Sequence, residues 1–338
     1  ADLAALSSDQ LQALSASAVA ALSTAQVASI TTAQVSKLTA NQVKALSATQ
    51  VAALTEAQVG ELTTTQVSAL SATQVKAMET ADVAKLSTSQ IQAVSASAVA
   101  AMTTAQVKAL TTTQAEKLTA GQVASLSATQ VTGLDTEDLA KFSSSQLQAL
   151  NATTVAALST AQVAALTTGQ VSNLTTAQLA ALTTDQVVAL TTAQISKLTE
   201  AQVTELSAAQ VQAITTANIQ QLTNSQVQAL TTTAVKGMLT EQVSSLTATQ
   251  LANLTTSQVA VLTADQIVSF TTDQISKLTA EQVGAMTTAQ IKSIATDDLQ
   301  KLTAAQIQGI TTNGVKALLA EQVAAFTTAQ ISKLTAEQ

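Results

Sequence analysis

The stretch Leu38–Leu46, L-T-A-N-Q-V-K-A-L, contains one full copy of the unit from which the chain is built. The unit is an octapeptide, L-[ST]-x-x-Q-[VI]-x-x, and its leucine, numbered position 1, returns every eighth residue from Leu6 to Leu334. All 42 copies of position 1 are apolar, and position 6 is Val, Ile or Leu in every complete octad except one, where Ala115 stands. This strict register predicts an ordered core despite the low complexity of the sequence.

The polar positions of the octad predict the start of a helix. Position 2 is nearly always Ser or Thr and position 5 nearly always Gln, which is the pattern of a capping box. With the N-cap at position 2, the apolar positions 1 and 6 fall where a hydrophobic staple requires them. We therefore expect about six helical residues and a tight corner in each octad.

The charges indicate the same helix polarity independently. Of the 21 acidic residues, 18 lie at positions 2 to 5, and all 14 lysines lie at positions 7 or 8. Acids near a helix N-terminus and cations near its C-terminus interact favourably with the helix dipole.

Two other architectures compete with a chain of short helices. In one continuous helix, an eight-residue repeat drifts by about 80° per copy, which would spread the apolar positions over every face. A β-solenoid remains the alternative, although eight Gly and no Pro leave it few corner residues. The predicted fold class is all-α, a solenoid of miniature helices, one per octad, each stabilised by its neighbours.

The unbroken period predicts a single continuous array over residues 1–338, and its exceptions reveal a longer repeat. Positions 5 without Gln fall into five pairs sixteen residues apart, whose first members are Asp2, Asp82, Asp138, Asn218 and Asp298. Their spacings of 80, 56, 80 and 80 residues define an 80-residue super-repeat with one copy three octads short. If that deletion removed one whole turn, a turn takes about 3.3 octads.

These exceptions have two interpretations: inherited drift after tandem duplication, or a recurring bend or docking zone. The octad between the members of each pair carries Gln at position 7. The candidate bend or interaction residues are Asp82, Gln92, Ala98, Asp138, Gln148, Thr154, Asn218, Gln228, Ala234, Asp298, Gln308 and Gly314.

The composition lacks the residues on which most enzymes and most ligand sites depend. The chain has no His, Cys or Arg, which removes the usual general base, thiol chemistry, zinc ligands and bidentate anion clamps. We expect no catalytic, cofactor or metal site, because acids such as Glu137 and Asp138 lie where helix-start acids belong. The net charge of −7 and the near-absence of aromatic residues disfavour nucleic acid, and no apolar run is long enough to span a membrane.

The runs Leu174–Leu182 and Leu190–Leu198, close to L-T-T-A-Q-V-x-x-L, carry a resemblance that covers the whole chain. They resemble octapeptide stretches of very long, Thr/Ala-rich bacterial surface or secreted proteins, which are adhesin-like or labelled as haem-utilisation or haemolysin-like. The resemblance implies an extracellular or cell-surface structural role. It carries no haem site here, because the chain has no His, Cys or Tyr.

We therefore expect an extracellular structural protein that forms rods or filaments by head-to-tail or lateral self-association. The alternative is the stalk or binding face of an adhesin with an unknown surface ligand, and a minor alternative is an ice- or surface-binding array. The chain opens and closes in mid-octad, which fits either a piece of a longer array or a subunit whose ends other copies cover.

Overall fold

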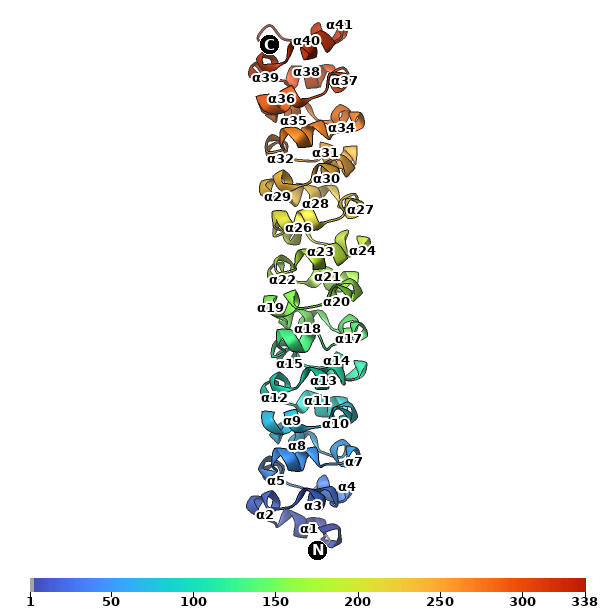
Figure 1. Ribbon diagram of the computed structural model, residues 1–338, viewed down its shortest axis with the longest axis vertical. Coiled ribbons are helices and arrows are strands. Elements are labelled where there is room, and N and C mark those ends of the chain that lie inside the picture. The colour runs from blue at the N-terminus through green and yellow to red at the C-terminus, as the bar shows by residue number, and fades with distance from the viewer. Residues whose placement is uncertain (1–2) are drawn as a thin grey trace. The chain divides into compact units, whose positions relative to one another are not determined.

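The computed structural model describes residues 3–338, which form a succession of very short helices (Figure 1). This part of the chain contains 41 α-helices and one 3-10 helix, and no strand. The predicted all-α solenoid of miniature helices is confirmed, and the β-solenoid alternative is wrong. Asp2, the first marker of the super-repeat, lies outside the described residues.

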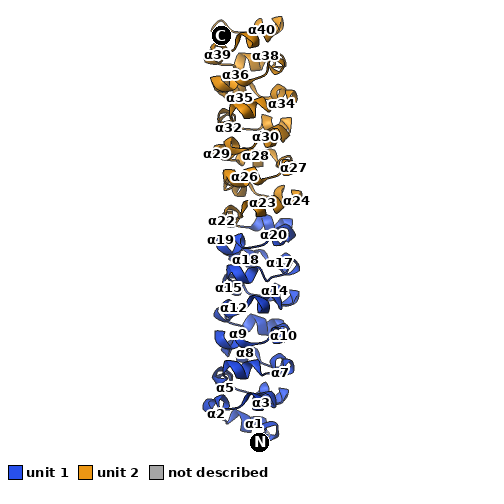
Figure 2. Ribbon diagram, in the orientation of Figure 1, with its two compact units in different colours: residues 1–174 blue, residues 175–338 orange. Residues whose placement is uncertain are grey.

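The helices fall into two compact units, residues 1–174 and 175–338, which are described separately (Figure 2). In the first unit the elements are η1 Leu3–Ala5, α1 Ser8–Gln12, α2 Ala16–Ala20, α3 Thr24–Ala28, α4 Thr32–Val35, α5 Ala40–Ala45, α6 Ala48–Ala52, α7 Glu56–Gly60, α8 Thr64–Ala69, α9 Ala72–Ala77, α10 Thr80–Lys85, α11 Thr88–Ala93, α12 Ala96–Ala101, α13 Thr104–Lys108, α14 Thr112–Lys117, α15 Ala120–Ala124, α16 Ala128–Val131, α17 Thr136–Lys141, α18 Ser144–Ala149, α19 Ala152–Ala156, α20 Thr160–Ala165 and α21 Thr168–Asn173. In the second unit they are α22 Thr176–Ala180, α23 Thr184–Ala189, α24 Thr192–Ile195, α25 Glu200–Thr204, α26 Ala208–Ala213, α27 Thr216–Ile219, α28 Asn224–Ala229, α29 Thr232–Gly237, α30 Thr240–Ser245, α31 Ala248–Ala252, α32 Thr256–Ala260, α33 Ala264–Val268, α34 Thr272–Lys277, α35 Ala280–Ala285, α36 Thr288–Ser293, α37 Thr296–Leu299, α38 Ala304–Gly309, α39 Thr312–Ala317, α40 Ala320–Ala325 and α41 Thr328–Ile331.

The octad Leu38–Ala45 shows how the sequence sets one helix. Thr39 is the N-cap, with φ −71° and ψ 155°, and its side chain accepts a hydrogen bond from the backbone N–H of Gln42 at 3.2 Å. In return, Gln42 Oε1 accepts from the backbone N–H of Thr39 at 2.8 Å. The predicted capping box is therefore present, and it satisfies two of the donors that a helix start leaves unpaired.

The corners between helices are extended rather than left-handed. Leu46, which ends α5, has φ −59° and ψ 138°, and Ser47, the next N-cap, has φ −70° and ψ 161°. No described residue has a positive φ. Because two extended residues suffice for each corner, the array needs neither a glycine nor a proline there.

Within each unit, helices pack against the helix three places further along the chain, as α9 does with α12 and α35 with α38. Successive turns are therefore offset by three octads, close to the predicted 3.3. The short copy of the super-repeat, three octads shorter than the others, thus lacks about one turn.

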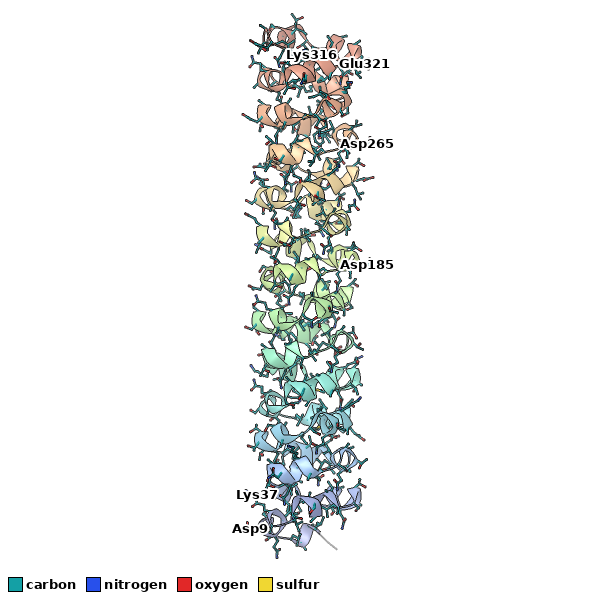
Figure 3. The ribbon with its side chains drawn as sticks, turned by 90° about the vertical axis from the view of Figure 1, so that its left-hand side faces the viewer. Asp9, Lys37, Asp185, Asp265, Lys316 and Glu321 are labelled. Carbon is teal, nitrogen blue, oxygen red and sulfur yellow. The ribbon has the colours of Figure 1, made fainter. Side chains whose placement is uncertain are left out.

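The core is made by positions 1 and 6, as predicted. Val51 at position 6 is fully buried and Leu54 at position 1 is 6% exposed, and both positions stay buried from Val27 to Ile310. The glutamines at position 5 are buried beside them. Charged residues such as Asp9, Asp185 and Asp265 instead project outward from the first turns of their helices (Figure 3).

Candidate functional site

The buried glutamine at position 5 is the most repeated polar feature of the molecule, and it links two helices. Gln42 caps its own helix through Oε1, and its Nε2 donates to the carbonyl oxygens of Leu11 at 2.9 Å, Gln12 at 3.2 Å and Leu14 at 2.8 Å. These carbonyls belong to the C-terminal end of α1, four octads earlier. One amide thus satisfies the start of one helix and the end of another, an arrangement that we call the glutamine clasp.

The clasp depends on the chemistry of a primary amide. A helix end leaves its last carbonyls without intrahelical donors, and these carbonyls are buried between turns. An amide carries an acceptor and two donors, whereas a carboxylate only accepts. This explains why position 5 is never Glu, although Glu would complete a capping box equally well and suit the helix dipole better.

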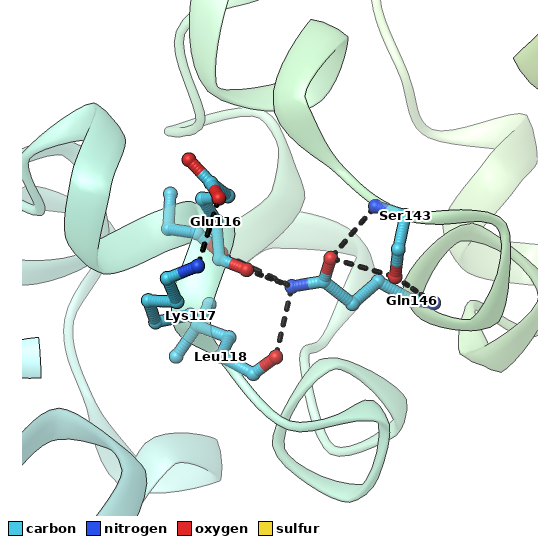
Figure 4. A network of polar contacts seen from close by, with 6 residues as sticks. Glu116, Lys117, Leu118, Ser143 and Gln146 are labelled. Atoms are coloured by element: carbon cyan, nitrogen blue, oxygen red, sulfur yellow. Dashed lines mark hydrogen bonds and ion pairs between the residues drawn. The ribbon is translucent and has the colours of Figure 1, made fainter. Parts of the chain in front are cut away.

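One clasp lies beside a polar groove in the first unit, and Figure 4 shows its polar contacts. Gln146 Oε1 accepts from the backbone N–H of Ser143 at 2.8 Å, and its Nε2 donates to the carbonyl oxygens of Glu116 at 3.1 Å and Leu118 at 2.8 Å. The groove has a volume of about 320 Å³, and its lining includes the ion pair between Lys117 and Glu116, at 2.9 Å. This ion pair lowers the pKa of the Glu116 carboxyl, first through the Lys117 hydrogen bond and then through its charge.

The candidate bend residues at position 5 stand where other octads have the glutamine, so the clasp is interrupted there, that is, absent or incomplete. Asp82 and Asp138 are buried, 3% and 2% exposed, and each accepts from the N-cap backbone N–H of its own helix, at 3.2 and 3.3 Å. Neither carboxylate can donate to the carbonyls of the preceding turn. Burial raises the pKa of both carboxyls above the ordinary value of 3.8, because it disfavours the charged form.

The other interruptions use shorter or nonpolar side chains. Asn218 Nδ2 reaches only the Leu190 carbonyl, at 3.0 Å, and Thr154 Oγ1 approaches only the Leu126 carbonyl, at 3.5 Å. Asp298 accepts from Thr272 Oγ1 at 2.8 Å. The remaining members of this set have no side-chain group that can donate: Ala98, Ala234 and Gly314.

The glutamines at position 7 of these zones point outward and toward the following turn. Gln148 Nε2 donates to the Asn173 carbonyl at 2.8 Å, and Gln308 Nε2 donates to the Lys333 carbonyl at 3.2 Å. Gln92 and Gln228 are exposed, and Gln92 lines the polar groove. The structure thus places all twelve candidate residues at or next to interrupted clasps, without gathering them into one pocket.

Sequence reasoning identified the capping half of the clasp and missed the half that crosses between turns. The strict preference for Gln over Glu at position 5 was the signal that could have revealed it, because only the amide adds a donor. Within residues 3–338 there is no group of three or more acidic side chains placed to hold a metal ion. No helix in the same range is long and apolar enough to cross a membrane.

Comparison with known proteins places the chain in a repeat family. Among solved structures, the leucine-rich repeat-containing protein LegL7 from Legionella pneumophila is similar at 12% identity over 60% of this chain and 76% of that protein, with a TM-score of 0.17. No curated protein matches the chain. The ALTTAQ repeat matches residues 1–32, 75–112, 131–168, 139–176, 168–200 and 291–328, which together cover just over half of the sequence. The chain is therefore a tandem-repeat protein that belongs to the ALTTAQ repeat family.

Proposed function

We propose that this chain is an extracellular structural protein whose role depends on the length of its repeat array and on self-association. The observation that carries the proposal is the glutamine clasp, because it makes the two faces of each ordinary turn complementary. Each turn presents amide donors to the preceding turn and carbonyl acceptors to the following one. The same interaction joins turns whether they belong to one copy of the chain or to two, and such head-to-tail contacts extend without closing.

Within one copy, the amide donors of a turn and the carbonyl acceptors of the turn before it form the contact that self-association would repeat. Gln10 and Gln26 complete their own capping boxes through Oε1; Gln10 is exposed to solvent and Gln26 is half-buried. Their Nε2 groups are the donors that would engage the carbonyl face of a turn in another copy. Within one copy, the contact between turns also buries the apolar positions 1 and 6, as for Leu54 and Val51, which adds the hydrophobic contribution that interfaces between obligate partners require.

The extracellular location rests on the resemblance to Thr/Ala-rich bacterial surface proteins. The runner-up role is the stalk or binding face of an adhesin, in which the array spaces or presents a ligand site and does not polymerise. The polar groove beside Lys117 is the feature that favours this second role, since it offers charged and amide groups to a surface ligand.

Electron microscopy of the 338-residue chain across a concentration series, without ligand, tests the proposal. We expect filaments of constant width that lengthen with concentration. The double variant Q10E/Q26E should abolish them, because it places two carboxylates against the acceptor face. The matched control Q92E/Q228E adds the same charge at exposed positions and should assemble normally. Isolated particles at every concentration would reject self-association and favour the adhesin stalk.

A further inference from the structure

The interrupted clasps are grouped, and each group occupies one turn of three helices. We call these the marker turns: α10–α12 and α17–α19 in the first unit, and α27–α29 and α37–α39 in the second. An ordinary turn such as α7–α9 holds the turn before it with three clasps. Its amides reach the carbonyl oxygens of Ile30 at 2.6 Å, Leu38 at 2.7 Å and Leu46 at 2.7 Å.

The marker turn α10–α12 keeps only one of those three clasps. Gln90 donates to the carbonyls of Val59 at 3.1 Å and Leu62 at 2.6 Å, while Asp82 and Ala98 provide no donor on either side of it. The other marker turns share the pattern. In α27–α29 the full clasp is made by Gln226 alone, and in α37–α39 by Gln306 alone.

The opposite face of the marker turn α10–α12 keeps all of its clasps. The helices α10, α11 and α12 receive complete clasps from Gln114, Gln122 and Gln130, with shortest distances of 2.6, 2.7 and 2.8 Å. In two later marker turns an outward glutamine adds a further bond to the following turn, as Gln148 does with Asn173. The weakening is therefore confined to one face, the one toward the preceding turn.

We propose that this face is a built-in joint, at which the array opens before the neighbouring turns of the same unit do. In a repeat array, stability is close to a sum of the stability of each repeat and of its contacts with neighbours. A turn that lacks two of three clasps has a weaker contact on that side, and its buried carbonyls gain less from closure. Local opening follows the lowest such free energy.

The joints also explain the long period of the sequence. Because one joint recurs every super-repeat, the array is divided into segments of ten octads, or of seven where the copy is short. With this division, a long structural protein can unfold locally at fixed turns while the segments between those turns stay folded. A joint does not depend on self-association, since it consists of contacts within one chain.

Hydrogen exchange followed by mass spectrometry on the dilute full chain tests the joint. We expect amides of α10–α12 to exchange on the order of ten-fold faster than those of α7–α9, as the loss of two hydrogen-bonded contacts implies. The variant D82Q/A98Q restores both clasps and should slow α10–α12 to the rate of α7–α9. A98Q alone, which changes no charge, should give part of this effect.

The control and the converse variant separate a joint from a general change in stability. D185Q/A177Q makes the same substitutions at exposed positions and should leave α10–α12 unchanged. Q58A/Q74A removes two clasps from an ordinary turn and should create a new fast-exchanging region at α7–α9. Equal exchange of α7–α9 and α10–α12 in the natural chain, or unchanged exchange in D82Q/A98Q, would overturn the proposal.

Discussion

Gln74 Nε2 donates a 2.7 Å hydrogen bond to the carbonyl oxygen of Leu46, which lies 28 residues earlier in the chain and one turn below in the same unit. The same side chain accepts from the backbone N–H of Ser71 at 2.7 Å. Gln74 is 3% exposed, so both bonds lie inside the molecule. The amide is therefore bound at both ends, and its two functions can be separated by mutation.

Q74E keeps the acceptor that caps the helix and loses the donor that crosses to Leu46. A capping box alone predicts little change, because Glu serves as well as Gln at this position. The clasp predicts a loss of about 1–3 kcal/mol in local stability at pH 7, larger than that of Q74A, because a buried carboxylate would face carbonyl oxygens. Hydrogen exchange of α5, α6 and α9 measures this loss.

Acidification provides the control for Q74E. A protonated carboxyl regains one donor, so Q74E should recover toward the natural chain at low pH, whereas Q74A should not. Q228E, at an exposed position, should be nearly neutral at any pH. If Q74E is as stable as the natural chain at pH 7, the bond to Leu46 contributes nothing and the clasp is only a cap.

The octad itself predicted where each helix begins and which positions form the core, although several helices are four or five residues long and not six. Thr39 as N-cap, Leu54 and Val51 as core, and the placement of charges all follow from interactions within about five residues, which sequence patterns report directly. The partner of Gln74 could not be predicted, because the 28-residue separation depends on how many octads make a turn. For the same reason, the sequence showed that Asp82 departs from the repeat but not that the glutamine it replaces would donate to carbonyls of the preceding turn.

Asp82 makes the stability of its turn depend on pH. Burial is the main cause of its raised pKa, with Glu79 and Glu56 adding repulsion and the backbone N–H of Glu79 opposing the shift. The folded state therefore binds this proton more tightly than the unfolded state does. The stability that the protonated carboxyl contributes is fully present below the unfolded pKa, near 3.8, and is lost as the pH rises through the higher folded pKa.

D82N should therefore stabilise the chain at pH 7 and have little effect near pH 3. The neutral amide avoids the cost of burying a charge, and Asn218 shows that a side chain of this length reaches a carbonyl of the preceding turn, at 3.0 Å. We expect a gain of about 1 kcal/mol, measured from denaturant unfolding of α10–α12 across pH. D185N, at an exposed site, should show no such pH dependence. A constant difference between D82N and the natural chain from pH 3 to pH 7 would contradict this account.

Two glycines should respond to alanine in opposite directions. Gly169 lies inside α21, and no side chain or neighbouring element comes within 4 Å of the place that an added methyl group would occupy, so G169A should stabilise the helix by about 0.5–1 kcal/mol. At Gly309, the added methyl would overlap the carbonyl oxygen of Ala280 on the adjacent helix α35. G309A should force α38 and α35 apart and cost about 1–3 kcal/mol. Thermal unfolding of the two variants measures both effects, and a stabilised G309A would show that these helices are not in close contact.

Leu239 occupies the N-cap of α30, where nearly every other octad has Ser or Thr, and its side chain is 47% exposed. Its backbone N–H still donates to Gln242 Oε1 at 2.9 Å, but the side chain accepts no bond from the helix start. L239T should supply the missing acceptor and stabilise α30 by about 1 kcal/mol.

The reciprocal change T247L removes the bond that Thr247 Oγ1 accepts from the Gln250 N–H, at 3.1 Å, and should cost α31 a similar amount. Hydrogen exchange of α30 and α31 measures both effects. Replacing a solvent-exposed leucine should cost little stability, so a destabilised L239T would mean that Leu239 packs against another surface.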